Sequence, residues 1–301
     1  MKCPLCESKE IKKIETIKKK NLISLYKIMT HTDFTYLLDK DIEFCECQYC
    51  KLRYYDPLIT GDERFYNSLQ KFDWYYMDEK EEYHYAKKYI SSTDKVLEVG
   101  SGKGAFAKHL LTKNYIGLDF SVNAKEMAEK NGITIKNEMI QDYALRNESN
   151  FDVVVSFQVL EHVSDPESFL EAKVKALKLG GKLIIAVPSE DSFLRYVYNG
   201  ILNMPPHHVT RWSDDTLRYV AKKYNLKVID IYHENIQPVH KRWYLSTLIQ
   251  NSIIKPKLLS QSFTRKIVSK FAGLSARFLI RGLKNEMLPY GHTVLVVYEK
   301  R

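Results

Sequence analysis

Residues 96–106, with the sequence VLEVGSGKGAF, constrain the fold more than any other part of this 301-residue chain. Val96, Leu97 and Val99 predict a buried parallel strand. Three glycines follow at alternate positions, and a helix is expected to start after them. Because glycine has no Cβ and adopts positive φ freely, a ligand can approach the backbone of such a turn, and free N–H groups at the helix start point toward it. The stretch therefore predicts a ligand site at the carboxyl end of a strand.

Strand and helix patterns alternate from residue 91 to about residue 239, which predicts a doubly wound α/β fold with a mostly parallel sheet. The seven expected strands lie near residues 96–99, 115–120, 133–136, 151–157, 182–188, 226–231 and 293–298. Asp119 ends the second strand, 19 residues after Gly100. A carboxylate there accepts hydrogen bonds from both hydroxyls of a ribose. It also suits the N-cap of the next helix, although Ser121 offers an alternative cap.

Four motifs together identify a family. VLEVGSGKGAF and GLDFS are followed by FDVVVSFQVLEHVSDP and LKLGGKLIIAVPS, in this order. The first motif alone satisfies the dinucleotide fingerprint G-x-G-x-x-A and would allow NAD. Over residues 91–239 and 289–301, however, the chain resembles class I S-adenosylmethionine-dependent methyltransferases with a Rossmann-like seven-stranded sheet. The resemblance is to bacterial enzymes of metabolite and surface-polysaccharide pathways, and a nicotinamide enzyme has no reason for the EHV segment.

The resemblance implies a set of residues that bind S-adenosylmethionine. Those expected to hold its methionine part and ribose are Glu98, Gly100, Gly102, Gly104 and Asp119. Those expected along the adenine are Phe120, Met139 and Ile140, and those at the methionine end are Phe157 and Gln158. The family usually has an acid at the position of Met139, so we expect Asp142 or a backbone group to replace it.

Residues 203–213, NMPPHHVTRWS, carry the strongest signal on the substrate side. Two prolines fix the backbone, and loops beyond the carboxyl ends of strands are where ligands bind in such sheets. A neutral His207 or His208 there can take the proton of a hydroxyl or amine that attacks the methyl group. Arg211 and Trp212 would add an anion-binding fork and a flat apolar face. Alternatively, the loop only caps the next helix through Ser213.

His162, in the EHV segment, also has two interpretations. It is either an orienting or capping histidine beside Asp165 and Pro166, or a third catalytic residue at the mouth of the site.

All five cysteines lie between residues 3 and 50. Cys3 and Cys6 repeat the C-x-x-C spacing of Cys47 and Cys50, which predicts a structural, tetrahedral Zn²⁺ site in a zinc ribbon over residues 1–60. Cys45 is the spare cysteine. The apolar alternation between the two pairs predicts an elongated hairpin. Residues 61–90 are expected to form aromatic linker helices around Phe72, Trp74, Tyr75 and Tyr76, which either pack between the modules or form a wall of the site.

Residues 240–288 predict a basic amphipathic helical insert. Residues 240–301 hold 12 Lys and Arg residues and only 2 Asp and Glu residues. The net charge of +9 of the whole chain therefore comes from this segment. An apolar stripe is expected at Phe263, Ile267, Phe271, Leu274 and Phe278, with Lys284 among the basic residues opposite. Two interpretations fit: a lid packed on the domain with a solvated basic face, or peripheral contact with an anionic membrane through residues 257–284.

These observations predict a methyltransferase that acts on a small-molecule acceptor, such as a sugar, a glycan intermediate or another metabolite. One alternative is an RNA methyltransferase, since some rRNA enzymes also carry an N-terminal zinc module. The charge distribution argues against a nucleic-acid partner, because the ribbon is neutral and the basic residues lie at the other end. A second alternative is a cofactor-binding scaffold without activity. The start, MKCPLC, does not resemble a signal peptide, so we expect a cytoplasmic protein. The sequence makes no prediction of the oligomeric state.

Overall fold

A seven-stranded sheet forms the centre of the protein. The structure, a computed structural model, describes residues 1–72, 77–197, 199–282 and 288–301. The strand order is β10-β11-β8-β7-β4-β5-β6. The strands are β4 (Val96–Val99), β5 (Tyr115–Leu118), β6 (Ile135–Lys136), β7 (Phe151–Phe157), β8 (Leu177–Pro188), β10 (Leu226–Asn235) and β11 (Tyr290–Lys300). β11 is antiparallel to both of its neighbours and the other pairs are parallel, which confirms the predicted seven-stranded, mostly parallel sheet.

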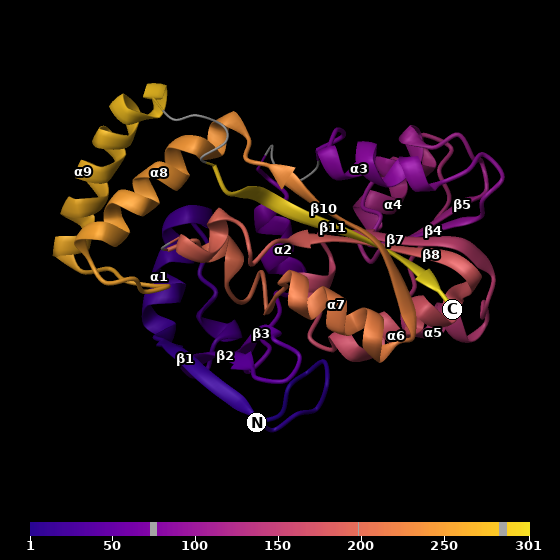
Figure 1. The fold of residues 1–301 in the computed structure, drawn as a ribbon, viewed down its shortest axis with the longest axis horizontal. Coiled ribbons are helices and arrows are strands. Elements are labelled where there is room, and N and C mark those ends of the chain that lie inside the picture. The colour runs from indigo at the N-terminus through magenta and orange to yellow at the C-terminus, as the bar shows by residue number, and fades with distance from the viewer. Residues whose placement is uncertain (73–76, 198, 283–287) are drawn as a thin grey trace.

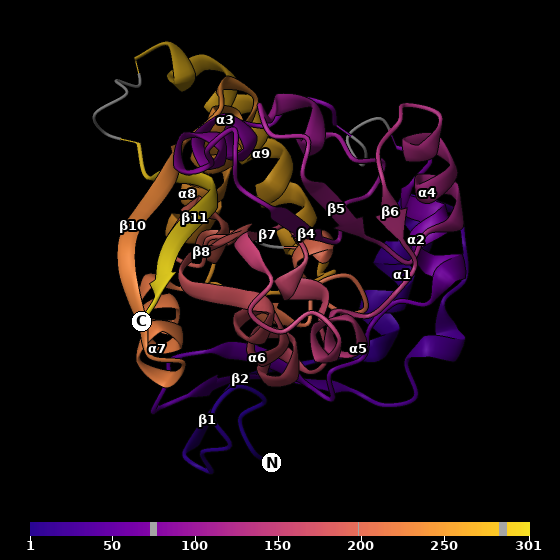
Figure 2. The ribbon, with the colours of Figure 1, turned by 90° about the vertical axis from the view of Figure 1, so that its right-hand side faces the viewer.

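Helices cover both faces of this sheet, which explains why its central strands are apolar along their length. All four residues of β4 are buried, and so are six of the seven in β7. Figure 2 shows α5 (Ile140–Leu145), α6 (Pro166–Ala176) and α7 (Asp214–Lys223) on one face. On the other face lie α3 (Glu81–Ala86) and α4 (Val122–Glu129). The carboxyl ends of β4, β5 and β7 are left for loops.

The helix expected after the glycine turn is wrong: only the 3₁₀ helix η3 (Phe106–His109) forms there. The connection between the glycine turn and β5 is too short for a longer helix. Thr112 donates to the carbonyl of Asp94 at 2.7 Å and accepts from the backbone N–H of Asn114, which fixes the chain before β5 begins. A single 3₁₀ turn fits in this short connection, and 3₁₀ turns are common as connectors.

The N-terminal residues form a second sheet of order β1-β2-β3-β9. Its strands are β1 (Ile11–Ile17), β2 (Ile42–Cys47), β3 (Arg53–Asp56) and β9 (Thr210–Arg211). The elongated hairpin predicted here is wrong in one arm, because residues after β1 form the helix α1 (Lys19–Thr30). Leu22 and Tyr26 lie one helical turn apart and are both buried, and Asp41 accepts the backbone N–H of Lys19 at the helix start. Helical spacing therefore prevails over strand alternation here.

The fourth strand of this sheet, β9, comes from the loop after β8, so the N-terminal residues and the predicted substrate loop share one sheet. The Tyr26 hydroxyl donates to the carbonyls of Ile201 and Met204 at 2.6 and 3.0 Å. The Tyr55 hydroxyl donates to the carbonyl of Asn203 at 3.0 Å. The N-terminal module therefore holds residues 201–211 in place, with the short helix α2 (Glu63–Leu69) packed between.

Two C-terminal helices, α8 (Pro238–Ile253) and α9 (Phe263–Leu279), lie side by side at one end of the molecule (Figure 1). Small residues of α9, Ala272 and Ala276, are buried. The predicted apolar stripe is exposed instead: Phe263 and Phe278 are 78% and 77% exposed. The interpretation of this stripe as a face packed on the domain is therefore wrong. No helix within the described part of the chain is long and apolar enough to cross a membrane.

Candidate active site

The glycine turn joins β4 to η3, and its three glycines all have positive φ: +75° at Gly100, +51° at Gly102 and +74° at Gly104. A Cβ at Gly100 would lie 2.3 Å from Cγ2 of Val159, which follows β7. L-residues with side chains rarely adopt such φ values, so both the conformation and the close packing require glycine at Gly100. The turn thus exposes backbone directly at the carboxyl end of β4.

Glu98 lies at the end of β4 and is only 2% exposed. The hydroxyl of Tyr115, in the neighbouring strand β5, donates to it at 2.5 Å. Burial raises the pKa of Glu98 to about 8, although this hydrogen bond opposes the shift. A cationic ligand group beside Glu98 would favour its ionised form. Tyr115 is a residue that the sequence analysis missed, and only the pairing of β4 with β5 brings it here.

Asp119 follows β5 and ties the glycine turn to the next segment. Its Oδ2 accepts the backbone N–H of Gly102 at 2.7 Å, and its Oδ1 accepts that of Ser121 at 2.8 Å. Burial raises its pKa, against these hydrogen bonds. Ser121 caps α4 by accepting from the N–H of Ala124, so Asp119 is not needed as the helix cap. The carboxylate therefore lies beside the turn, where a ribose bound to that backbone would meet it.

A shallow depression of about 600 Å³ continues from Asp119 over the ends of β5 and β6. Its lining includes Phe120, Met139 and Asp142, three residues predicted along the adenine. Phe120 and Met139 are 61% and 47% exposed and offer apolar surface. Ile140 differs: its side chain is 2% exposed and packs into the core, so it does not line the depression. The reason is that Ile140 begins α5, whose first turn faces the sheet.

Phe157 and Gln158 stand at the end of β7. Phe157 is buried and packs against Phe106 and Tyr83, with ring centroids 4.7 and 4.9 Å apart. Gln158 has a φ of +56°, and its Nε2 donates to Glu82 at 3.4 Å and to Thr293 at 3.3 Å. Tyr83 and Glu82 of α3 therefore cover this end of the glycine turn. The sequence showed only that residues 61–90 are rich in aromatic residues.

The three predicted histidines come together in one buried group at the end of β7, the histidine pocket (His162, His207 and His208). His162 lies in the 3₁₀ helix η4 (Leu160–His162), and the other two follow Pro205 and Pro206. The rings of His207 and His208 stack at 4.4 Å, and His162 meets them edge-on at 4.6 and 4.7 Å. The backbone N–H of Val209 donates to the carbonyl of Glu161, which joins the two loops.

Burial lowers the pKa values of all three imidazoles, which favours their neutral form. The pKa of His162 falls to about 4, with the backbone at His207 and Gln158 opposing the shift, and those of His207 and His208 fall well below the usual value. Tyr66 of α2 forms a wall of the pocket, with its ring 5.9 Å from that of His162 and 6.3 Å from that of His207. Phe65 on the same helix packs in the core between the modules and also lies beside the pocket, with its ring 6.2 Å from that of His207. Helix α2 therefore does both things expected of the linker. Trp74, Tyr75 and Tyr76 lie outside the described residues, as does Lys284.

Glu161 is a further residue of this pocket that the sequence analysis missed, although it directly precedes His162. It is 1% exposed, and its Oε1 lies 3.8 Å from Nε2 of His162 and 3.9 Å from Nε2 of His208. Burial raises its pKa to about 8. The sequence signal that could have identified Glu161 is its place as the acidic residue of the EHV segment.

Arg211 and Trp212 do not face a substrate, contrary to prediction. Arg211 is 4% exposed, donates to the carbonyl of Asn203 at 3.0 Å and pairs with Glu190 at 3.4 Å. Trp212 is fully buried and donates to the Thr210 hydroxyl. Both side chains are used to attach β9 and its loop to the N-terminal sheet. Ser213 caps α7 through the N–H of Thr216, as expected.

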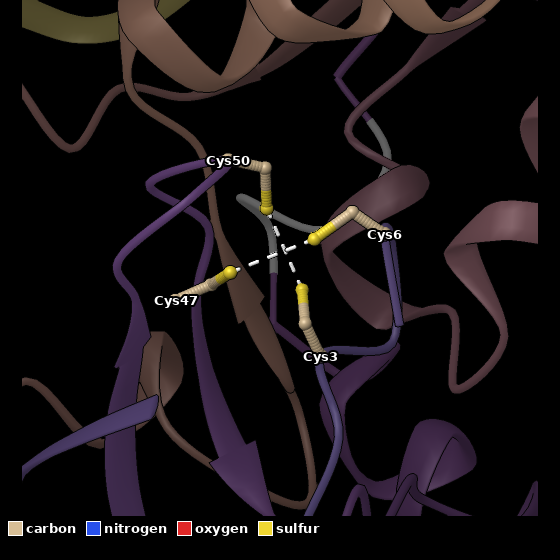
Figure 3. Close-up of side chains that lie close together, drawn as sticks. All are labelled: Cys3, Cys6, Cys47 and Cys50. Carbon is tan, nitrogen blue, oxygen red and sulfur yellow. Dashed lines mark hydrogen bonds between the residues drawn. The ribbon is translucent and has the colours of Figure 1, made fainter. Parts of the chain in front are cut away.

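Four of the five cysteines meet in a second buried group, shown in Figure 3. Sγ of Cys3 lies 3.5 Å from that of Cys50, and Sγ of Cys6 lies 3.5 Å from that of Cys47. These distances are far longer than the roughly 2.05 Å of a disulfide and close to the separation of thiolates around one Zn²⁺. The contact with Cys50 lowers the pKa of Cys3 to about 6.

The two cysteine pairs lie in equivalent turns. The N–H of Glu7 donates to the carbonyl of Cys3, and that of Lys51 donates to the carbonyl of Cys47, each at 3.0 Å. Glu7 and Lys51 also share a positive φ, of 58° and 63°. Cys45 points elsewhere, with its Sγ 3.5 Å from Sδ of Met1.

The strand order and the glycine turn, with acidic residues at the ends of β4 and β5, define the class I methyltransferase fold. Residues 73–231 match the model of a family described as a methyltransferase domain, over just more than half of the chain. The chain therefore belongs to this methyltransferase family. A solved S-adenosylmethionine-dependent methyltransferase from Thermotoga maritima has the same fold, with a TM-score of 0.51 and 19% identity over 79% of this chain and 97% of that one.

Curated relatives match a part of the chain. An uncharacterized protein of Methanocaldococcus jannaschii is 38% identical over 102 residues, which are 34% of this chain and 48% of that protein. The ubiquinone biosynthesis O-methyltransferase of Pectobacterium atrosepticum is 29% identical over 146 residues, which are 40% of this chain and 61% of that enzyme. The chain thus spans about half to three fifths of the length of these relatives.

Proposed function

We propose that the protein transfers the methyl group of S-adenosylmethionine to a hydroxyl group of a small molecule, such as a sugar, a glycan intermediate or another metabolite. The observation that carries this proposal is the glycine turn with Glu98 and Asp119 at adjacent strand ends of a class I methyltransferase fold. When bound, S-adenosylmethionine supplies an electrophilic methyl group on a sulfonium. The protein itself positions the acceptor and removes its proton.

The residues at the strand ends fit this cofactor in order across the sheet. Glu98 is a buried carboxylate suited to the cationic methionine end, and Asp119 would accept the ribose hydroxyls. Phe120 and Met139 would lie along the adenine in the depression beyond, and Asp142 would replace the missing acid. Gln158 and Phe157 would close the methionine end.

The histidine pocket adjoins the cofactor side, because Val159 packs on Gly100 and lies three residues before His162. Methyl transfer to a hydroxyl releases a proton, and the neutral imidazoles are able to accept it. The name of the Pectobacterium relative, an O-methyltransferase, favours oxygen as the acceptor atom.

The experiment that tests this function is measurement of S-adenosylhomocysteine release with a panel of hydroxyl metabolites, including nucleotide sugars. We expect turnover with at least one member, and loss of that turnover in Asp119→Ala. Methylation of RNA alone, or cofactor binding without any acceptor in the panel, would contradict the proposal.

We propose that Cys3, Cys6, Cys47 and Cys50 bind one structural Zn²⁺. Four sulfurs in two equivalent turns leave no open position for substrate, so the ion would hold the N-terminal sheet and, through β9, the substrate loop. Metal analysis of protein purified without chelator tests this proposal, with Cys45→Ala as the variant that should keep its zinc.

We propose that α9 docks on an anionic membrane surface, where a lipid-linked acceptor would be met. Its exposed apolar residues include Phe263, Phe271 and Phe278, and the basic residues Lys266, Lys270 and Arg277 lie around them. This combination of apolar and basic side chains complements anionic headgroups. The full chain should sediment with anionic vesicles and not with zwitterionic ones, and Phe271→Ser with Phe278→Ser should abolish this. Equal sedimentation with both vesicle types would contradict the proposal.

A further inference from the structure

The histidine pocket presents only hydrogen-bond acceptors to its own centre. Nδ1 of His162 lies 2.6 Å from the carbonyl of His207, Nδ1 of His207 lies 2.8 Å from that of Leu202, and Nδ1 of His208 lies 3.1 Å from Oδ1 of Asn203. Because carbonyl oxygens only accept, each ring donates through Nδ1. A neutral imidazole that carries its proton on Nδ1 has a lone pair on Nε2. The three Nε2 atoms are therefore acceptors.

Glu161 adds a fourth acceptor with no hydrogen bond of its own. Its own backbone N–H lowers its pKa, but neither carboxylate oxygen has a hydrogen bond of proper geometry among the described residues. The contacts of Oε1 with Nε2 of His162 and of His208, at 3.8 and 3.9 Å, are too long for hydrogen bonds. Leaving a buried polar group unpaired costs roughly 1–3 kcal/mol, and more for a charge, so such a group needs an explanation.

Neighbouring cations do not supply one. The charge of Lys80 lowers the pKa of Glu161, but Lys80 makes no hydrogen bond to it, and its Nζ lies over the ring of Tyr83. Arg211 uses its guanidinium on Glu190 and the carbonyl of Asn203. A proton on Glu161 could form a hydrogen bond only if an imidazole Nε2 moved about 1 Å closer to the carboxyl group. The remaining acceptor atoms of the pocket would still face one another without a donor.

We infer that Glu161, His162, His207 and His208 bind a divalent transition-metal ion. One nitrogen of each ring lies within 4.8 Å of the others. Zn²⁺ binds imidazole at about 2.0–2.1 Å, so its ligands lie roughly 3.4 Å apart. Binding would draw the rings together and turn His207 and His208 out of their stacked arrangement, because each nitrogen lone pair lies in the plane of its ring. The Nδ1 contacts to carbonyl groups are the outer contacts that orient histidine ligands. Imidazole with one carboxylate suits Zn²⁺, Fe²⁺, Co²⁺ or Ni²⁺, and differs from the all-sulfur cysteine group.

Such an ion would also act in the reaction, a part of the inference that rests on the proposed methyl transfer, whereas metal binding does not. A hydroxyl that joined the ion as a fifth ligand would become more acidic, since an ion held by imidazole and carboxylate can expand beyond four ligands. Its O–H bond breaks and the proton passes to the free oxygen of Glu161. The new O–CH₃ bond then forms as the S–CH₃ bond breaks. Glu161 would in this case take the role of base that the histidines otherwise have.

Metal stoichiometry of the full chain tests the inference without any acceptor. Protein stripped with chelator is titrated with Zn²⁺ and, separately, with Co²⁺. We expect two equivalents to bind. With Co²⁺, one site should show thiolate-to-metal charge transfer and the other only d–d bands, because it has no sulfur. A wild-type protein that binds one equivalent, with charge-transfer bands alone, overturns the inference.

Variants assign the second equivalent. His207→Gln, His208→Gln and Glu161→Gln should keep the charge-transfer bands and lose the sulfur-free equivalent, whereas Cys47→Ser should lose the charge-transfer bands. His31→Asn, at an exposed helix end, is the matched control and should bind both. Two equivalents retained in all three pocket variants overturn the inference. If those variants fail to fold, stoichiometry and the cobalt spectrum of His84→Asn decide it, because this change removes the other sulfur-free group of possible ligands in the described part of the chain, formed by Glu79, His84 and His109. If the wild-type protein binds two ions but transfers no methyl group to any acceptor, the proposed function is contradicted and the metal site is not.

Discussion

The cofactor half of the site and the histidine pocket are built in different ways. At the ends of β4 and β5, the proposed cofactor contacts come from neighbouring residues of two adjacent strands and from the backbone of the glycine turn. The histidine pocket instead takes its rings from two separate loops, and tyrosines 26 and 55 of the N-terminal module hold one of these loops. Local geometry therefore governs cofactor binding, whereas long-range packing governs the pocket. Substitutions should separate the two.

Gly102→Val should have the largest effect, because it attacks the cofactor half directly. Gly102 has a φ of +51° and donates its N–H to Asp119, and a β-branched residue is a genuine outlier at such φ. We expect S-adenosylhomocysteine binding to be abolished in calorimetry while zinc content stays at the wild-type value. Gly273→Ala is the control and should bind normally, because Gly273 lies within α9 and a Cβ there would meet no atom within 4 Å beyond the backbone of its own helix. Binding at wild-type affinity in Gly102→Val would mean that the turn is not the cofactor site.

His208→Ala should affect the other half alone. Removal of a proton acceptor or metal ligand from the pocket should lower turnover by about 10²–10⁴-fold, whereas affinity for S-adenosylhomocysteine should stay unchanged. Steady-state kinetics and calorimetry on the same preparation measure both quantities. Wild-type turnover in this variant would place the reaction outside the pocket, and a parallel loss of cofactor affinity would show that the two halves are not separable.

Cys47→Ser tests whether the N-terminal module supports the pocket through β9. Loss of one sulfur ligand should lower the free energy of unfolding by about 3 kcal/mol if the proposed zinc site is formed, because the site would be disrupted. Denaturant unfolding measures this change. Cys45→Ala should cost only about 1 kcal/mol, since that side chain is buried but lies outside the sulfur group. Equal losses in the two variants would argue that the sulfur group holds no metal.

The smallest expected effect is a pH dependence of cofactor affinity. In the free protein, burial raises the pKa of Glu98 to about 8, so the carboxyl group is largely protonated at pH 7. If the cationic end of the cofactor favours the carboxylate, binding releases a proton. Affinity should then rise with pH up to about pH 8, by at most about tenfold per unit. Calorimetry between pH 6 and about pH 8 measures the slope. Glu98→Gln should remove it, and a flat profile in the wild type would contradict this role.

Much of the cofactor half was predictable because its determinants are consecutive residues. A strand, three glycines and an acid after the next strand specify the backbone path without knowledge of distant contacts. The exception is Ile140, which has the right position in the chain but points into the core, since the phase of α5 is set by packing. Tyr115 escaped prediction because only strand pairing places it beside Glu98.

On the substrate side, the sequence predicted the residue types of the pocket, but several of the predicted contacts are wrong. The two histidines after Pro205 and Pro206 do meet His162, but Arg211 and Trp212 face the N-terminal sheet. The pairing of β3 with β9 over residues 53–55 and 209–211 decides this orientation. Such a pairing joins residues more than 150 positions apart, and neither strand shows it in its own pattern.

The sequence by itself determined the class I fold, the cofactor loop and the spacing of the two cysteine pairs, since each depends on short-range backbone geometry. Only the tertiary structure decided which side chains face the acceptor. It gathered three imidazoles, two of them beside the carboxylate of Glu161, and it turned the apolar stripe of α9 outward. The physical reason is that burial and hydrogen-bond partners belong to the packed molecule: an imidazole acts as a base, a metal ligand or a cap according to what its two nitrogens meet.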